Sequence, residues 1–129
     1  MKKVLTIFLL IFSNIHADEF KLEMITKGFE RPWSLSFVDD HILFVTEKEG
    51  NIKLVDLKDK SIKNVNHNLK ILEDGQGGLL DILFKKNIIF VSYSENRLNG
   101  LSSTSVARAN FNTKKLDFKN IFRAEPPIN

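Results

Sequence analysis

The chain has 129 residues, a formal net charge of +3 and no cysteine. The lack of cysteine excludes disulfides and thiolate metal sites. The lysines near 58–63 and 85–86 stand beside turn residues, and no basic stripe is interleaved with aromatic groups. This pattern indicates solvated loops, so we expect no nucleic-acid partner.

Residues 1–17 have the pattern of a secretory signal peptide. Two lysines follow Met1, the segment Val4–Phe12 is almost wholly apolar, and Ala17 supplies a small residue at the boundary. A membrane anchor is the alternative, but these nine residues fall short of the roughly 20 that a spanning helix needs. We therefore expect cleavage after Ala17, a mature chain with no membrane span and a net charge of +1, and a periplasmic or secreted location.

A repeat dominates the remaining residues, 18–129. Ile42–Val45 and Ile88–Val91 have almost the same sequence, and their flanking residues also align. Self-similarity at this spacing in strand-like segments is typical of β-propeller blades of roughly 40–50 residues. The sequence predicts an all-β fold with blade units at roughly 30–70 and 76–123. Closure of a propeller needs at least about four blades, so we expect this chain to be the first part of a longer protein.

Alternation and turn residues place the strands of each unit. In the first unit, Trp33, Leu35 and Phe37 are expected to share a buried face, with serines on the opposite face. The segment 94–103 contains Asn-Gly and is expected to be an exposed loop, and most of the nine phenylalanines after residue 17 are expected in the core between blades. The expected strands are 33–37, 42–45, 52–57, 62–65, 79–84, 88–93, 104–111 and 116–122.

The most specific segment is Asp74–Asp81, between the two units. Its three closely spaced glycines permit positive φ or a close approach of the backbone, and they surround one amide side chain, Gln76. Considered alone, the segment is compatible with a structural turn between blades. It is neither a P-loop nor a dinucleotide fingerprint, because no lysine follows and the next residues form a strand.

These segments together resemble the opening third of the soluble glucose/sorbosone dehydrogenase family. The resemblance covers roughly residues 28–125. One departure is the sequence Glu47-Lys48-Glu49, where family members usually carry an arginine before the glycine; we expect it to alter a turn and not the chemistry. The matching segments, in order, are Arg31–Phe37, Leu43–Glu47 with Gly50–Ile52, Gly75–Asp81, Phe90–Ser94 and Val106–Arg108.

The resemblance implies an exported, six-bladed propeller that oxidises aldoses with pyrroloquinoline quinone (PQQ) and calcium. It implies that Gln76 contacts the sugar and the cofactor near the propeller axis. It also implies that the catalytic base is a histidine beyond Asn129, and that the calcium ligands and the cationic residues for PQQ belong to later blades. We therefore assign no catalytic residue and no metal ligand within this chain, and the electron acceptor is unidentified.

Other polar residues receive structural interpretations. His41 and His67 are expected to be solvated loop residues. Asp74 and Asp81 are the better candidates for buried hydrogen bonding, with a role in the site as the alternative. Tyr93 is expected to pack, with a cofactor contact as its alternative, and Arg108 is expected to pair with a carboxylate.

Two functional hypotheses stay open, together with a weaker third one. The first is PQQ-dependent oxidation of aldoses to lactones. The alternative is a non-catalytic propeller of the same shape that binds a glycan or a protein. A lactonase would need metal-binding carboxylates that the sequence does not show. The 129 residues are expected to be inactive and to fold poorly alone, because a two-blade piece leaves apolar faces such as those bearing Trp33 or Phe90 open to water.

Overall fold

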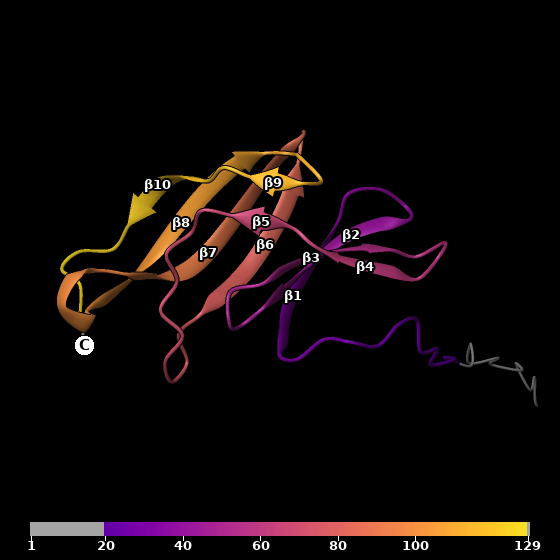
Figure 1. Cartoon of the computed structure of the whole chain (residues 1–129), viewed down its shortest axis with the longest axis horizontal. Helices are drawn as coiled ribbons and strands as arrows, with labels where there is room; N and C mark the ends of the chain where they lie inside the picture. Colours follow the sequence, from indigo (N-terminus) through magenta and orange to yellow (C-terminus); the bar gives the residue numbers. More distant parts are fainter. Residues whose placement is uncertain (1–19, 129) are drawn as a thin grey trace, which may run out of the picture.

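The computed structural model describes residues 20–128, which form an all-β structure with two four-stranded antiparallel sheets (Figure 1). The first sheet has the strand order β1-β2-β3-β4, and the second has the order β10-β8-β7-β6. The elements are β1 (Pro32–Phe37), β2 (Ile42–Glu47), β3 (Ile52–Asp56), β4 (Ser61–Asn64), β5 (Asn66–His67), β6 (Leu79–Lys85), β7 (Ile88–Asn96), the short 3-10 helix η1 (Leu98–Gly100), β8 (Ser102–Asn110), β9 (Lys115–Leu116) and β10 (Lys119–Arg123). The predicted all-β fold is confirmed. The signal peptide predicted at 1–17 lies outside the described residues.

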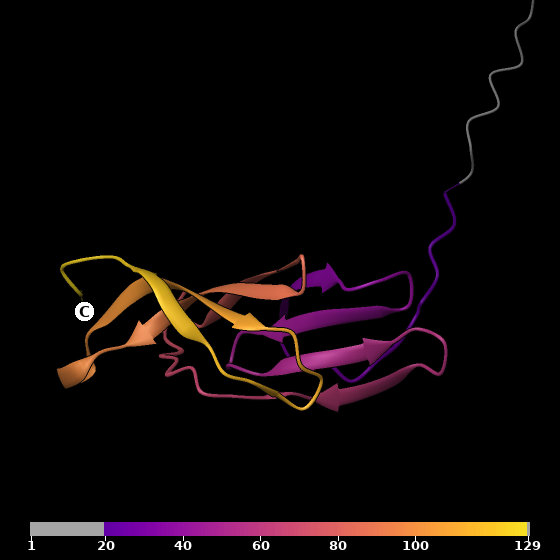
Figure 2. The same ribbon diagram turned by 90° about the horizontal axis from the view of Figure 1, so that it is seen from above.

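The two sheets lie closest together along one edge. Strand β6 packs against β1 and β2, and the views in Figures 1 and 2 show the two sheets as neighbouring layers that diverge from this edge. On the outer side, β5 and β9 form a short parallel pair that links the first unit to the second. This arrangement is that of two adjacent blades, with β1 and β6 as the inner strands.

Polar side chains form the contact at this inner edge. Ser34 Oγ donates to Asp81 Oδ1, and Thr46 Oγ1 donates to the Leu80 carbonyl at 2.6 Å. The backbone N–H of Phe84 donates to Ser36 Oγ at 2.8 Å. Serine and threonine are small enough to let the inner strands approach closely, and they also satisfy donors of the neighbouring strand.

The expectation that the apolar face of the first strand is its buried face is therefore wrong, whereas the exposure of Trp33 agrees with the expectation for a two-blade piece. Its serine face is turned toward β6, whereas Trp33, Leu35 and Phe37 are 49%, 56% and 53% exposed. Alternation located the strand correctly, but it could not show that the polar face meets the neighbouring sheet. On the second unit, Leu83 and Phe122 are also about half exposed, at 51% and 55%.

The main core lies between the two sheets. It contains Phe44 from β2, fully buried, with the rings of Phe84 and Phe111 packed around it. Phe111 makes edge-to-face contacts with Phe44 at 5.9 Å and with Phe84 at 5.4 Å between ring centroids. Phe118 is the fourth phenylalanine of this core. The expectation that most phenylalanines would lie here is too broad, because Phe20, Phe37 and Phe122 are exposed.

Two strand predictions need correction in the second unit. The expected loop 94–103 is shorter, because β7 continues to Asn96 and β8 begins at Ser102. The expected strand 116–122 is divided into β9, which pairs with β5, and β10, which pairs with β8. Both differences come from pairing partners that are distant in sequence, and a local pattern does not specify such partners.

Candidate functional site

The glycine segment forms a loop that is tied to the end of β7. The Leu72 N–H donates to the Ser94 carbonyl at 2.9 Å, and the Ser94 N–H donates to the Gly78 carbonyl at 2.8 Å. Within the loop, the Gly77 N–H donates to the Asp74 carbonyl at 2.6 Å, which closes a tight turn around Gln76. The loop therefore has a defined position at the entrance to β6.

Two of the glycines are required by close contacts. Gly78 has φ of +151°, and a Cβ atom there would lie 2.3 Å from the Lys48 carbonyl oxygen. A Cβ atom on Gly77 would lie 2.8 Å from Ser94 Oγ. The close approach predicted from the sequence is confirmed at these two positions. Gly75, by contrast, has φ of +49°, and a Cβ atom there would meet no other atom within 4 Å.

Charged residues from the first unit brace this loop. Lys48 Nζ donates to the Gly75 carbonyl, and it lies 3.9 Å from Glu73 Oε1. Arg31 also contacts Glu73, with 3.1 Å between Nη1 and Oε1, and its Nε bonds to Glu49. Lys48 and Glu49, two of the three residues at which the resemblance departs from its expected sequence, thus belong to a charged cluster that reaches the glycine loop.

Gln76 lies exposed on this loop beside a cavity of about 390 Å³. The cavity is lined on one side by the loop and on the other by the facing ends of β7 and β8. Its lining is rich in hydroxyl groups, which come from Ser94, Ser102, Ser103 and Thr104. Within the described residues, the Gln76 amide has no hydrogen-bond partner, so its donor and acceptor are free to meet a ligand.

The two aspartates beside the glycines are exposed, contrary to the expectation of burial. Asp81 nevertheless has a structural role, since its Oδ1 accepts from Ser34 Oγ and from the Ile82 N–H at 2.9 Å. Asp74 supplies its carbonyl to the turn and also lines the Gln76 cavity.

The histidines are placed differently from one another. His41 is exposed in the turn before β2, as predicted. His67 is not a solvated loop residue: it lies in β5, is partly buried, and its Nδ1 accepts from the Leu69 N–H at 3.3 Å. Its Nε2 therefore carries the proton and donates to the Gly50 carbonyl at 2.7 Å. Neither histidine lines the cavity beside Gln76.

Tyr93 packs as predicted, with 2% exposure, and its hydroxyl donates to Asn120 Oδ1 at 2.8 Å. Burial raises the pKa of this phenol, although the bond to Asn120 acts in the opposite direction. Arg108 is exposed and forms no ion pair within residues 20–128, so the predicted pairing with a carboxylate is wrong.

Sequence reasoning missed two buried carboxylates, Glu47 and Glu95, which are 0% and 8% exposed. Glu95 Oε2 accepts from Ser105 Oγ at 2.7 Å, from Asn120 Nδ2 at 2.9 Å and from Arg123 Nε at 2.8 Å. Burial acts to raise the pKa of Glu95, but the bonds from Arg123 and Ser105 and the nearby guanidinium charges outweigh it and lower that pKa. A glutamate at the end of a strand is usually exposed to solvent. No local feature of the sequence therefore indicated that Glu95 is buried among these polar side chains.

Within residues 20–128, no group of three or more histidine, aspartate or glutamate side chains is placed to hold a metal ion. None of the helical segments in this range is long and apolar enough to cross a bilayer.

Comparison with known proteins identifies the family. The model of the glucose/sorbosone dehydrogenase family matches residues 29–129, which is most of the chain. The chain belongs to this family. Its resemblance to the family, inferred above from segments such as the glycine loop, is confirmed. A search of curated proteins found no match.

Solved structures of sugar dehydrogenases share the fold. A glucose dehydrogenase has 30% identity and a TM-score of 0.73, with 78% of this chain and 34% of that chain covered. The soluble aldose sugar dehydrogenase of Escherichia coli, in its apo form, has 27% identity and a TM-score of 0.73 over 81% of this chain and 33% of its own. The PQQ-bound aldose sugar dehydrogenase of Streptomyces coelicolor has 20% identity and a TM-score of 0.70, with coverages of 81% and 34%, and shows the fold alone. The chain thus spans about a third of the length of these structures, and its two sheets are two blades of their propeller.

Proposed function

We propose that this glucose/sorbosone dehydrogenase family member takes part in the PQQ-dependent oxidation of an aldose to its lactone, with Gln76 contacting the sugar. The observation that carries this proposal is the free amide of Gln76 beside a cavity lined by hydroxyl groups. Sugars present many hydroxyl groups that both donate and accept hydrogen bonds, and this lining matches them. The 27% and 30% identity to solved sugar dehydrogenases supports the same substrate class.

Gln76 can orient a sugar, but it cannot act as a base. A carboxamide does not take up a proton near neutral pH, whereas it can donate to one sugar oxygen and accept from another hydroxyl group. Holding the reacting carbon in position is a contribution to rate in itself. The backbone hydrogen bonds and close contacts that attach the loop to Ser94 and Lys48 support this positioning role.

The described residues fit only part of a PQQ site. The Gln76 amide can contact a carbonyl or hydroxyl oxygen, but the carboxylates of PQQ call for cationic partners, and no lysine or arginine among the described residues lines this cavity. When bound, PQQ supplies the two-electron acceptor for the oxidation. We propose that its cationic partners and the calcium ligands lie outside residues 20–128. We propose the same for the catalytic base, because His41 and His67 do not line the cavity.

The proposal includes export and a separate electron acceptor. The pattern of residues 1–17 supports removal of a signal peptide after Ala17 and a periplasmic or secreted location. Amino-terminal sequencing of the exported protein tests this point, and a chain that retains residues 1–17 would contradict it.

The function is tested with the whole enzyme that carries this chain, supplied with PQQ and calcium. Sugar-dependent dye reduction is measured for the wild type and for Gln76→Ala, with Asn64→Ala as the control because Asn64 is an exposed amide on β4. Loss of a bond that orients the sugar is expected to lower kcat/KM by about 10- to 100-fold in Gln76→Ala only. An unchanged kcat/KM would overturn the role of Gln76. Sugar binding without any turnover by the wild type would favour the non-catalytic alternative.

A further inference from the structure

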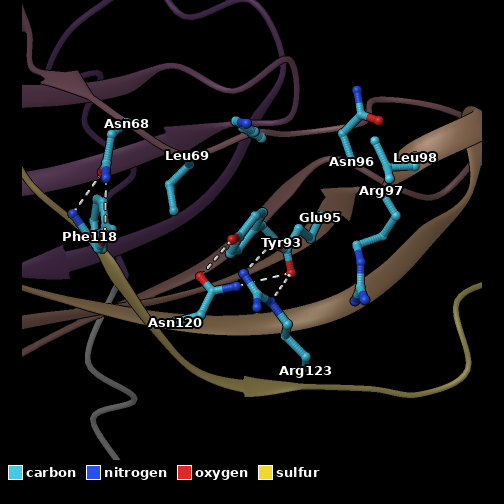
Figure 3. A pocket seen from close by; sticks show the side chains of 11 residues that line it. Asn68, Leu69, Tyr93, Glu95, Asn96, Arg97, Leu98, Phe118, Asn120 and Arg123 are labelled. Carbon is cyan, nitrogen blue, oxygen red and sulfur yellow. Dashed lines mark hydrogen bonds and ion pairs between the residues drawn. The ribbon is translucent and has the colours of Figure 1, made fainter.

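A second, larger cavity lies away from the glycine loop. It has a volume of about 600 Å³, which is within the usual range of small-molecule sites. Its walls are the end of β7, the strand β10 and the segment that follows β5. Figure 3 shows Tyr93, Glu95 and Asn120 grouped around Arg123, which comes from β10, while Arg97, which directly follows β7, stands to one side of this group.

The carboxylate of Glu95 and the amide oxygen of Asn120, two acceptors of this cavity, are already occupied. Glu95 Oε2 accepts three hydrogen bonds, and its Oε1 accepts from Arg123 Nη2 at 2.9 Å. Asn120 Oδ1 accepts from the Tyr93 hydroxyl. An incoming ligand would therefore find little acceptor capacity on these two residues.

Donor groups, in contrast, remain available. Within residues 20–128, Arg123 Nη1 and Lys70 Nζ have no hydrogen-bond partner. The Arg97 guanidinium bonds to Ser103 Oγ at 3.0 Å and to Glu125 Oε1 at 2.8 Å, which leaves some of its five N–H groups unused. The surplus of free donors favours a ligand that is rich in acceptor oxygens.

The charge of the lining agrees with this requirement. Lys70, Arg97 and Arg123 contribute three positive charges, and Glu95 is the single negative residue among the described ones that line the cavity. Glu95 pairs with Arg123, and Glu125, beside the cavity, pairs with Arg97, so one positive charge remains in excess. Leu69 and Phe118 add an apolar wall that can contact carbon atoms. The cavity thus combines fixed cations with an apolar surface, as sites for small organic anions do.

We propose that this cavity binds a small organic molecule that carries a carboxylate or phosphate group. The anionic group lies against Lys70, Arg97 and Arg123, and the carbon skeleton lies against Phe118. The site is separate from the Gln76 cavity, since the two cavities share no lining residue. The proposal does not depend on sugar oxidation.

Isothermal titration calorimetry on the whole protein tests the site without turnover. The probes are benzoate for the carboxylate, phenyl phosphate for the phosphate, benzamide as the neutral match, and inorganic phosphate as a simple ion. At least one of the two organic anions is expected to bind with an affinity at least about tenfold above those of benzamide and inorganic phosphate. Lys70→Gln and Arg97→Gln are each expected to weaken that binding by about tenfold, through loss of a charge-assisted hydrogen bond.

Lys114→Gln is the matched control, because Lys114 is exposed and does not line the cavity. It should leave the affinity unchanged. Circular dichroism establishes that each variant is folded, and the exposed position of Lys70 makes Lys70→Gln the variant with the smaller structural cost. Three results would overturn the proposal: no organic anion binds, inorganic phosphate binds equally well, or the Lys70 and Lys114 variants lose the same affinity.

Discussion

The β2–β3 and β7–β8 hairpins share an apolar centre but differ in length. Strand β2 has six residues and closes through a short turn to β3, whereas β7 and β8 have nine residues each. The extra length of the second hairpin, near Glu95 and Ser103, supplies walls for both cavities. The comparison indicates that the repeated apolar core specifies the blade, while the extra length of the second hairpin contributes walls to both candidate sites.

Each hairpin also contains a buried carboxylate that joins separate segments. Glu47 accepts from the Glu30 N–H and from Asn51 Nδ2, both at 2.9 Å, and it lies 3.5 Å from Lys53 Nζ. It thereby connects the chain before β1 to the β2–β3 hairpin. Glu95 connects β7 to β8 and β10 through its bonds to Ser105, Asn120 and Arg123. The two glutamates have similar burial, but their cationic partners differ in exposure.

The largest effect is expected at Gly78, where the two hairpins meet. Gly78→Ala would place Cβ 2.3 Å from the Lys48 carbonyl oxygen at φ of +151°, so the backbone must move. We expect the free energy of unfolding to fall by about 3–5 kcal/mol, as measured by urea denaturation of the whole protein. Gly75→Ala is the control and should cost only about 1–2 kcal/mol, because its φ is +49° and its surroundings are open. Equal losses would show that the contact between the hairpins is dispensable.

The next effect separates the two buried carboxylates. Glu47→Gln leaves the Lys53 ammonium unpaired at 16% side-chain exposure, whereas Glu95→Gln leaves an Arg123 side chain that is 52% exposed. Since water can solvate Arg123 more easily, we expect a loss of about 3 kcal/mol for Glu47→Gln and about 2 kcal/mol for Glu95→Gln. Chemical denaturation at neutral pH measures both values. The reverse order would mean that the exposure of the cation does not control the cost.

The lowered pKa of Glu95 predicts a dependence on pH. The folded state favours the ionised carboxyl, so its contribution to stability is present above the ordinary pKa of 4.5 and is lost as pH falls below it. The difference in unfolding free energy between the wild type and Glu95→Gln should therefore shrink as the pH is lowered below 4.5. Denaturation curves at several pH values measure this difference. A constant difference would contradict the assigned cause of the pKa shift.

The sequence predicted what depends on local patterns. Alternation and the repeat located the strands, and the glycine spacing predicted close contacts that the structure confirms at Gly77 and Gly78. It could not predict which face of β1 meets β6, because a serine face that joins two sheets looks like a solvated one. Glu95 was missed for a similar reason: its partners Asn120 and Arg123 lie 25 and 28 residues away, so only the fold brings them together. The role proposed for Gln76 came from the family resemblance and not from the pattern.

The smallest effect concerns the hydroxyl of Tyr93, which separates packing from hydrogen bonding in the longer hairpin. Tyr93→Phe keeps the buried ring but removes the donor to Asn120 Oδ1, so we expect a loss of about 1 kcal/mol in unfolding free energy. Arg108→Gln is the control, since Arg108 is exposed on the adjacent strand β8 and should change stability by less than about 0.5 kcal/mol. If the two variants lose the same stability, the bond to Asn120 does not help to hold β10 against the sheet. If Tyr93→Phe alone is destabilised, the polar cluster around Glu95 contributes to stability beyond the packing that both hairpins share.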